Sequence, residues 1–199
     1  MFPVGSVLLP HHELVLHIFE PRYRAMTRVC LAGDRRFGVV LIERGSEVGG
    51  GDTRCWAGTM AEITEAVAFQ DGRFGLGLLG RERFRVTRWL TDDPYPRADV
   101  EPLVDRPSPE LGPARVILER HLRKVVAMRT ELGDVAPPAT FELSPDPVEA
   151  TWQASSLGGL GPADAQRVLE VDSAAERLAL VTSILAEEES VLAQRMAGG

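Results

Sequence analysis

An apolar run followed directly by a Glu-Pro pair marks residues 14–23, which read LVLHIFEPRY. The beginning of this segment, LVLHI, has the composition of a buried strand. Proline has no N–H to lose in the first turn of a helix, and its fixed φ already suits that conformation. The segment therefore predicts a strand that stops at Phe19 and a helix that starts near Pro21.

The helix predicted next has one apolar face. Tyr23, Met26, Thr27 and Cys30 follow at the i, i+3, i+4 and i+7 spacing of a single helix face, whereas the neighbouring arginines fall mostly elsewhere. Gly33 comes soon after this face ends. Because glycine tolerates a left-handed φ, we expect Gly33 to close the helix.

Short strands separated by turn signals are expected in the rest of the first half of the chain. Residues 37–42, FGVVLI, do not alternate apolar with polar side chains, so both faces of this strand should be covered. Asp71 and Gly72 supply the positive φ values that a tight hairpin turn needs. The pattern predicts a β-barrel or sandwich with one small helix near its start. The other expected strands cover residues 4–9, 14–18, 55–69, 74–79, 83–90 and 98–104.

The second half of the chain has helical patterns. Ser108 is a good N-cap and Pro109 a good first helical residue, so a helix should start there and end at Gly133. Residues 146–149 and 173–176 resemble capping boxes, in which carboxylates and backbone N–H groups satisfy each other at a helix start. The other expected helices cover residues 147–157, 162–169 and 174–196.

The sequence of residues 14–26, LVLHIFEPRYRAM, resembles the signature of the amino-terminal domain of Lon proteases. The four expected helices also match the helical half of that region in order and spacing, so the resemblance covers nearly the whole chain. Similar short motifs occur in the same order at residues 2–4, 8–10, 36–42, 58–63, 71–73, 80–86 and 93–95.

This resemblance implies a fold and a binding role. The fold is α+β: residues 1–105 would form a PUA-like, six-stranded β pseudobarrel with one short helix, and residues 106–199 a four-helix C-terminal subdomain. The role is that of a stand-alone Lon substrate-binding-domain protein, which recognises unfolded or extended protein or peptide segments. Such a module would act as an adaptor in protein quality control or bind one partner.

Catalysis and cofactors are not expected. A Lon protease needs an ATPase module, but the phosphate-cradling motif Gly-x-x-x-x-Gly-Lys-Ser/Thr is absent from the sequence. Lys124 is the only lysine and lies in the middle of a predicted helix, and no downstream domain follows to hold a serine–lysine dyad. The sequence therefore predicts a protein that is not an enzyme.

The histidines do not predict a metal site. His11 and His12 are adjacent, so they project in different directions from an extended chain, and their spacing from His17 fits no familiar zinc pattern. Ordinary surface or packing roles explain them better. We expect His17 to be the most buried of the four histidines.

Apolar side chains near strand ends are the candidate peptide-binding residues. Leu9, Pro10, Phe19 and Phe69 should lie where a barrel mouth or groove would be, with Arg22 at its rim. An apolar groove beside an open strand edge can hold an extended segment through main-chain hydrogen bonds and side-chain pockets. The alternative is that the apolar residues only close the core.

The strand-to-helix motif has a structural interpretation as well. Glu20, Pro21 and Tyr23 are expected to fix the corner between strand and helix, because most patterned residues specify a fold. Contact of Glu20 or Tyr23 with a peptide is the alternative.

Charge and composition limit the partners. The net charge of −7 disfavours nucleic acid, although PUA-like barrels elsewhere bind RNA, so an RNA-binding module is the second interpretation. A small enzyme with an unrecognised site is the third. The sequence has no signal-peptide pattern and no apolar stretch long enough to span a bilayer, so we expect a cytoplasmic protein with Cys30 and Cys55 reduced. The oligomeric state is not predicted.

Overall fold

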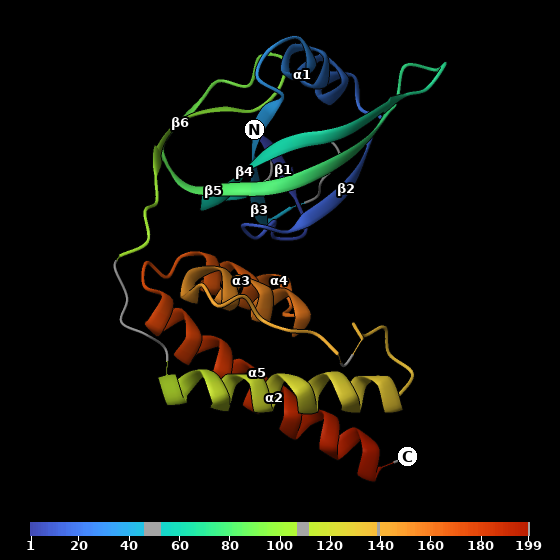
Figure 1. Ribbon diagram of the computed structural model, residues 1–199. Coiled ribbons are helices and arrows are strands. Elements are labelled where there is room, and N and C mark those ends of the chain that lie inside the picture. Colours follow the sequence, from blue (N-terminus) through green and yellow to red (C-terminus); the bar gives the residue numbers. More distant parts are fainter. Residues whose placement is uncertain (46–52, 107–111, 139, 199) are drawn as a thin grey trace. The chain divides into compact units, whose positions relative to one another are not determined.

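A computed structural model describes residues 1–45, 53–106, 112–138 and 140–198 (Figure 1). The chain divides into two compact units, Met1–Leu103 and Val104–Gly199. Among the described residues the first unit contains a six-stranded mixed sheet and one helix, and the second contains four helices, so the expected α+β class is confirmed. That residues 1–105 and 106–199 fold as separate domains stays a prediction.

The elements of the two units are as follows. The first unit contains β1 (Phe2–Val4), β2 (Glu13–Ile18), α1 (Pro21–Ala32), β3 (Arg36–Arg44), β4 (Thr53–Ala68), β5 (Phe74–Leu90) and β6 (Arg97–Pro102). The second unit contains α2 (Gly112–Glu131), α3 (Pro147–Leu157), α4 (Pro162–Leu169) and α5 (Ala174–Ala197).

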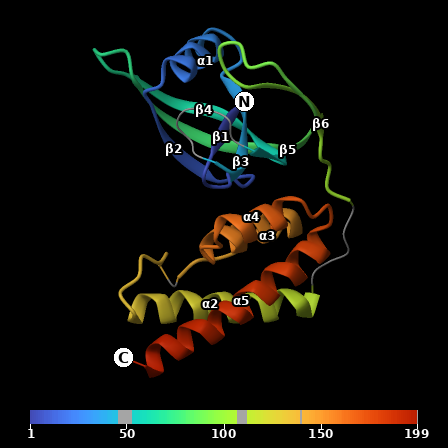
Figure 2. The ribbon, with the colours of Figure 1, turned by 180° about the vertical axis from the view of Figure 1, so that it is seen from behind.

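The sheet runs in the order β1-β3-β4-β5-β2, and β6 pairs with β5 off this path. β1 pairs with β3 in parallel, and the other neighbours are antiparallel. The long hairpin of β4 and β5 turns at Asp71 and Gly72, as predicted, and extends past the neighbouring strands (Figures 1 and 2). β1 and β2 lie at the two ends of the path, so each has a neighbour on one side only.

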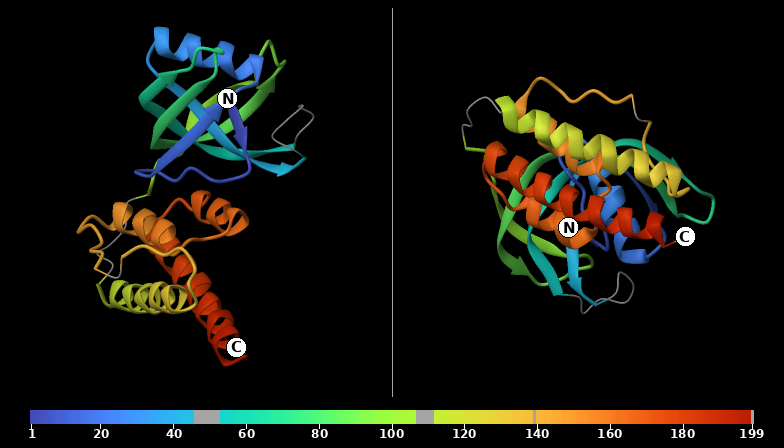
Figure 3. Two further views of the ribbon diagram at one scale, coloured as in Figure 1. Left: turned by 90° about the vertical axis from the view of Figure 1, so that its right-hand side faces the viewer. Right: turned by 90° about the horizontal axis from the view of Figure 1, so that it is seen from below.

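The core of the first unit lies between the sheet and α1, which crosses one end of the strands (Figure 3). The helix starts at Pro21, as the Glu-Pro pair predicted, and buries Tyr23, Met26 and Thr27. Residues 37–41 of β3 are buried without interruption, which confirms the prediction of a strand covered on both faces. The apolar patterns of α1 and β3 thus predicted correctly which of their residues are buried.

Two strand predictions are wrong, one for β1 and one for β5, and the loop between β1 and β2 connects them. β1 ends at Val4 instead of continuing to Leu9, and residues 74–90 form one strand that Gly80 does not interrupt. The loop folds back on β5: the N–H of His11 donates to the carbonyl oxygen of Gly80 at 2.8 Å, and the N–H of Gly80 donates to His12 at 2.8 Å. Gly80 therefore permits close backbone approach rather than a break.

Replacing Gly80 by Ala is expected to lower the free energy of unfolding by about 1–3 kcal/mol, because a Cβ there would collide with the backbone carbonyl of Leu9. The control is Gly75→Ala, whose new Cβ would meet the Phe69 ring at an ordinary 3.7 Å and should change stability by less than about 0.5 kcal/mol. Urea denaturation of both variants measures the difference. Equal stability of the two would contradict the close approach of the loop to β5.

Some helix ends differ from expectation. Gly33 follows α1 with φ −111°, so it does not use a left-handed conformation; Arg35 takes the positive φ, at 61°. Gly133 after α2 has φ 76°, as expected of a closing glycine. The predicted N-cap Ser108 and first residue Pro109 lie outside the described residues.

In the second unit α2 and α5 cross and pack together, and α3 and α4 pack against α5 (Figure 1). Both predicted caps form: the backbone N–H of Glu149 donates to Asp146 Oδ1 at 2.8 Å, and that of Glu176 donates to the Ser173 side chain at 3.5 Å. One buried side chain, Arg177 of α5, was not singled out by the sequence.

Candidate functional site

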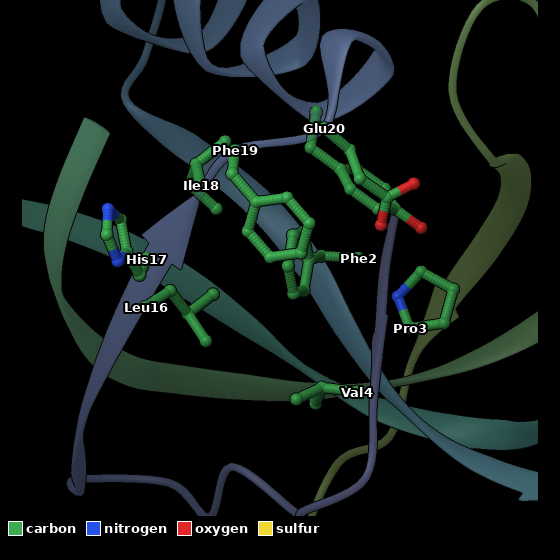
Figure 4. Close-up of a pocket in the computed structure, with 9 residues that line it drawn as sticks. Phe2, Pro3, Val4, Leu16, His17, Ile18, Phe19 and Glu20 are labelled. Atoms are coloured by element: carbon green, nitrogen blue, oxygen red, sulfur yellow. The ribbon is translucent and has the colours of Figure 1, made fainter. Parts of the chain in front are cut away.

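The two strands at the ends of the sheet path, β1 and β2, border a pocket of about 130 Å³ (Figure 4). It is lined by the three residues of β1, by residues 16–20 and by Tyr23 of α1. An edge strand presents backbone N–H and C=O groups that have no partner strand on that side. The pocket thus combines an apolar lining with two sheet edges.

The alternation of β2 determines which side chains face this pocket. Leu16 and Ile18 are buried and point inward, whereas Val15, 81% exposed, and His17 lie on the opposite face. Phe19 follows the last strand residue and is 52% exposed, although it also lines the pocket. In Figure 4 its ring lies between the two strands.

The corner beside the pocket is held by an ion pair and by ring packing. Arg22 Nε donates to Glu20 Oε2 at 3.0 Å, and the Arg22 guanidinium lies over the ring of Tyr23, 4.5 Å from its centroid. Tyr23 is buried, with its ring centroid 4.5 Å from that of Phe2. These contacts support a structural role for Glu20, Pro21 and Tyr23 at the start of α1. Contact of Arg22 with a peptide stays a prediction.

Of the predicted binding residues only Phe19 lines the pocket; Arg22, Leu9, Pro10 and Phe69 do not. Leu9 and Pro10 are buried in the first unit. This burial agrees with the alternative interpretation, in which these residues close the core and do not contact a peptide. Phe69 is exposed at the end of the hairpin, with its ring centroid 5.7 Å from that of His17. Phe19, Phe69 and Arg22 therefore remain candidates, and Phe19 is the apolar one at the pocket itself.

An exposed surface next to the pocket was missed by the sequence analysis. On the outer side of the sheet, Gly75 of β5 pairs with His17 on one side and Val67 on the other, and Gly77 pairs with Val15. The two glycines have no side chains of their own; the ring of Phe69 lies beside Gly75, and the side chains of Glu65 and Thr64 lie beside Gly77. We call Val15, His17, Val67 and Phe69 the outer face. Its signal in the sequence was the alternation of β2 together with the glycines opposite it.

The prediction that His17 is the most buried histidine is wrong. His17 is exposed on the outer face, whereas His12 and His121 are half-buried. Its strand neighbours Leu16 and Ile18 take the inward positions, and Gly75 opposite has no side chain to cover the imidazole.

The charged groups at the pocket are few. Glu20 is the only carboxylate among the lining residues, and it is paired with Arg22. The carboxyl groups with altered pKa lie elsewhere: a hydrogen bond from Arg81 lowers the pKa of Glu62, and one from Lys124 lowers that of Glu189. Within the described residues no group of three or more His, Cys, Asp or Glu side chains is arranged to hold a metal ion, and no helix is long and apolar enough to cross a membrane.

Residues 1–187 match the sequence model of the ATP-dependent protease La (LON) substrate-binding domain. The chain belongs to this family. The match describes a substrate-binding domain and not a proteolytic one, and it includes the pocket and most of the helical unit. The resemblance noted in the sequence of residues 14–26 is thereby confirmed.

Relatives of this Lon substrate-binding domain are longer proteins. Lon protease 2 of Myxococcus xanthus is 27% identical over 199 aligned residues, which cover 94% of this chain and 23% of that protein. The Lon protease of Methylocella silvestris is 27% identical over 194 residues, which cover 94% of this chain and 24% of that protein. The chain thus spans about a quarter of the length of these relatives.

Solved structures share the fold. The crystal structure of a Lon N-terminal domain protein from Xanthomonas campestris superposes with a TM-score of 0.64 and 28% identity, covering 92% of this chain and 95% of the other. The N-terminal domain of the Mycobacterium avium complex Lon protease has a TM-score of 0.62 and 16% identity, over 94% and 95% of the two chains. The fold is therefore that of a Lon N-terminal domain.

Proposed function

We propose that this Lon substrate-binding domain is a non-catalytic module that recognises polypeptides, and that it binds an extended segment at the pocket between β1 and β2. The observation that carries the proposal is the position of an apolar pocket between two edge strands. An extended chain can add to such an edge by main-chain hydrogen bonds, while a pocket selects its side chains. Recognition of this kind depends little on sequence, which suits a receptor for unfolded protein.

The exposed apolar side chains support the same role. Phe19 lies at the pocket, and the outer face continues from His17 to Phe69 at the hairpin. Exposed apolar side chains that lie together on a soluble protein typically mark a binding surface. In this proposal Phe19 and Phe69 contact the peptide, and Arg22 lies at the rim of the pocket. Leu9 and Pro10 do not contact the peptide but hold the loop between β1 and β2 in place.

The family and its relatives give the biological setting of the proposal. The relatives are Lon proteases, and the matching region is described as their substrate-binding domain. A chain with this domain suits an adaptor in cytoplasmic protein quality control, built on a PUA-like pseudobarrel with a four-helix subdomain. Binding of unfolded segments is the property that such an adaptor must have.

The proposal predicts that the wild-type protein binds fluorescently labelled α-casein, an unfolded polypeptide, in an anisotropy titration. Phe19→Ala should weaken this binding by about tenfold or more, because a large aromatic at a pocket typically contributes over 1 kcal/mol. Trp56→Ala is the matched control: Trp56 is as exposed, at 55% against 52%, but does not line the pocket. No binding of α-casein, or an equal loss in both variants, would contradict the proposal.

RNA binding is a second candidate because of one aromatic cluster. Trp56 and Trp89 have ring centroids 6.5 Å apart, and Arg54 lies 5.0 Å from the centroid of the Trp89 ring. Bases stack on such side chains. The nearby Arg88 is paired with Asp99, which weakens the attraction for phosphate. A gel-shift with single-stranded RNA at low salt, lost in Trp56→Ala, would favour this function over peptide binding.

A further inference from the structure

The pocket between β1 and β2 restricts what a bound segment can insert. We propose that it is an anchor site for one uncharged side chain between leucine and phenylalanine in size, carried by an extended segment. This inference rests on the proposed function and adds the chemical class of the ligand to it.

The size limit comes from the pocket volume. About 130 Å³ is slightly less than the cavity of about 150 Å³ that takes up benzene when lined by aliphatic and aromatic side chains. A leucine side chain or a phenyl ring therefore fills the pocket, whereas a methyl group leaves it largely empty. The two-ring indole of tryptophan is too large unless Phe19 moves aside.

The lining excludes a charged anchor. Phe2, Leu16 and Ile18 contribute apolar surface, and the one carboxylate, Glu20, already accepts the hydrogen bond from Arg22 at 3.0 Å. An inserted carboxylate would have to compete with Glu20 for Arg22. An inserted ammonium group would have to compete with Arg22 for Glu20. Burying either charge without a partner is costly.

The number of anchors follows from strand geometry. Successive side chains of an extended segment point to opposite sides, so the neighbours of the inserted residue face away from the pocket. The inward-facing residues of β2 that line the pocket, Leu16 and Ile18, are two positions apart. One inserted side chain between them occupies the available space.

The test uses labelled eleven-residue peptides of Gly, Ser and Thr with two Lys residues at each end and one central residue that is varied. Anisotropy titrations should give affinities for central Leu or Phe at least about tenfold higher than for Ala, Glu or Trp. The variant Phe19→Ala opens the pocket and should bring the Trp peptide closer to the Phe peptide in affinity, a change of preference that simple misfolding does not produce.

The outcomes separate the inference from the proposed function. If α-casein binds but the peptides bind equally for every central residue, or not at all, the anchor site is wrong and polypeptide recognition stands. If neither α-casein nor any peptide binds, both fail. If sedimentation shows a dimer that Phe19→Ala abolishes, and no peptide binds, the pocket is occupied by a second copy of the chain and the inference is overturned.

Discussion

Replacing Arg177 by Met is expected to lower the free energy of unfolding by roughly 3–5 kcal/mol. The Arg177 side chain is completely buried: Nε donates to Thr151 Oγ1 at 2.8 Å, and Nη1 donates to Asp105 Oδ1 at 2.8 Å and to the carbonyl of Val171 at 2.9 Å. Its guanidinium also lies 3.7 Å from the centroid of the Trp152 ring. Methionine fills much of the same volume but leaves the three acceptors without these hydrogen bonds.

Arg195→Met is the matched control, on the same helix. Arg195 pairs with Asp134 at 2.9 Å, but the two side chains are 50% and 38% exposed, so solvent screens this ion pair and it should contribute little to stability. Urea unfolding followed by far-UV circular dichroism reports on the helices of both variants. A loss in Arg177→Met as small as that in Arg195→Met would mean that the buried network does not stabilise the second unit.

Replacing Tyr23 by Ala is expected to lower the free energy of unfolding by about 3–5 kcal/mol, which is typical of aromatic truncation in a core. Tyr23 is 3% exposed and packs against Phe2 beneath Arg22, where β1 and the start of α1 meet. Its removal opens a cavity next to the pocket, so peptide binding should fall together with stability. Urea unfolding followed by tryptophan fluorescence measures the first effect.

Two variants control for this result. Tyr23→Phe keeps the ring and its packing, so it should retain most of the stability that Tyr23→Ala loses. Val29→Ala changes an exposed residue of the same helix and should have an effect below about 0.5 kcal/mol. If Tyr23→Ala folded with wild-type stability, the structural role of this residue at the corner would be refuted.

Sequence patterns gave correct predictions where the conformation depends only on residues a few positions away. The strand ends and the helix starts at the Glu-Pro pair because proline acts on its own turn, and the face of Tyr23 and Met26 is buried because helical spacing places them together. The caps at Asp146 and Ser173 depend on residues three positions away. None of these features requires knowledge of distant segments.

Burial of the candidate site residues depended on distant segments. Leu9 and Pro10 have the composition of groove residues, but the loop that carries them packs on Gly80, far away in sequence. Arg177 has the sequence environment of a surface arginine, and only the folded chain brings Asp105 and Thr151 to it.

The sequence alone therefore determined the family, the strand-to-helix corner, the order of most elements and the choice of Phe19 as an exposed apolar candidate, because periodicity and turn chemistry act over a few residues. The tertiary structure alone decided that β1 and β2 lie at the two ends of the sheet path with a pocket between them. It also decided that Val15 and His17 face outward over two glycines. β2 pairs with residues of β5 about sixty positions away, and β1 with residues of β3 about 37 positions away. The hydrogen bonds that fix this strand order and register leave no local pattern in the sequence.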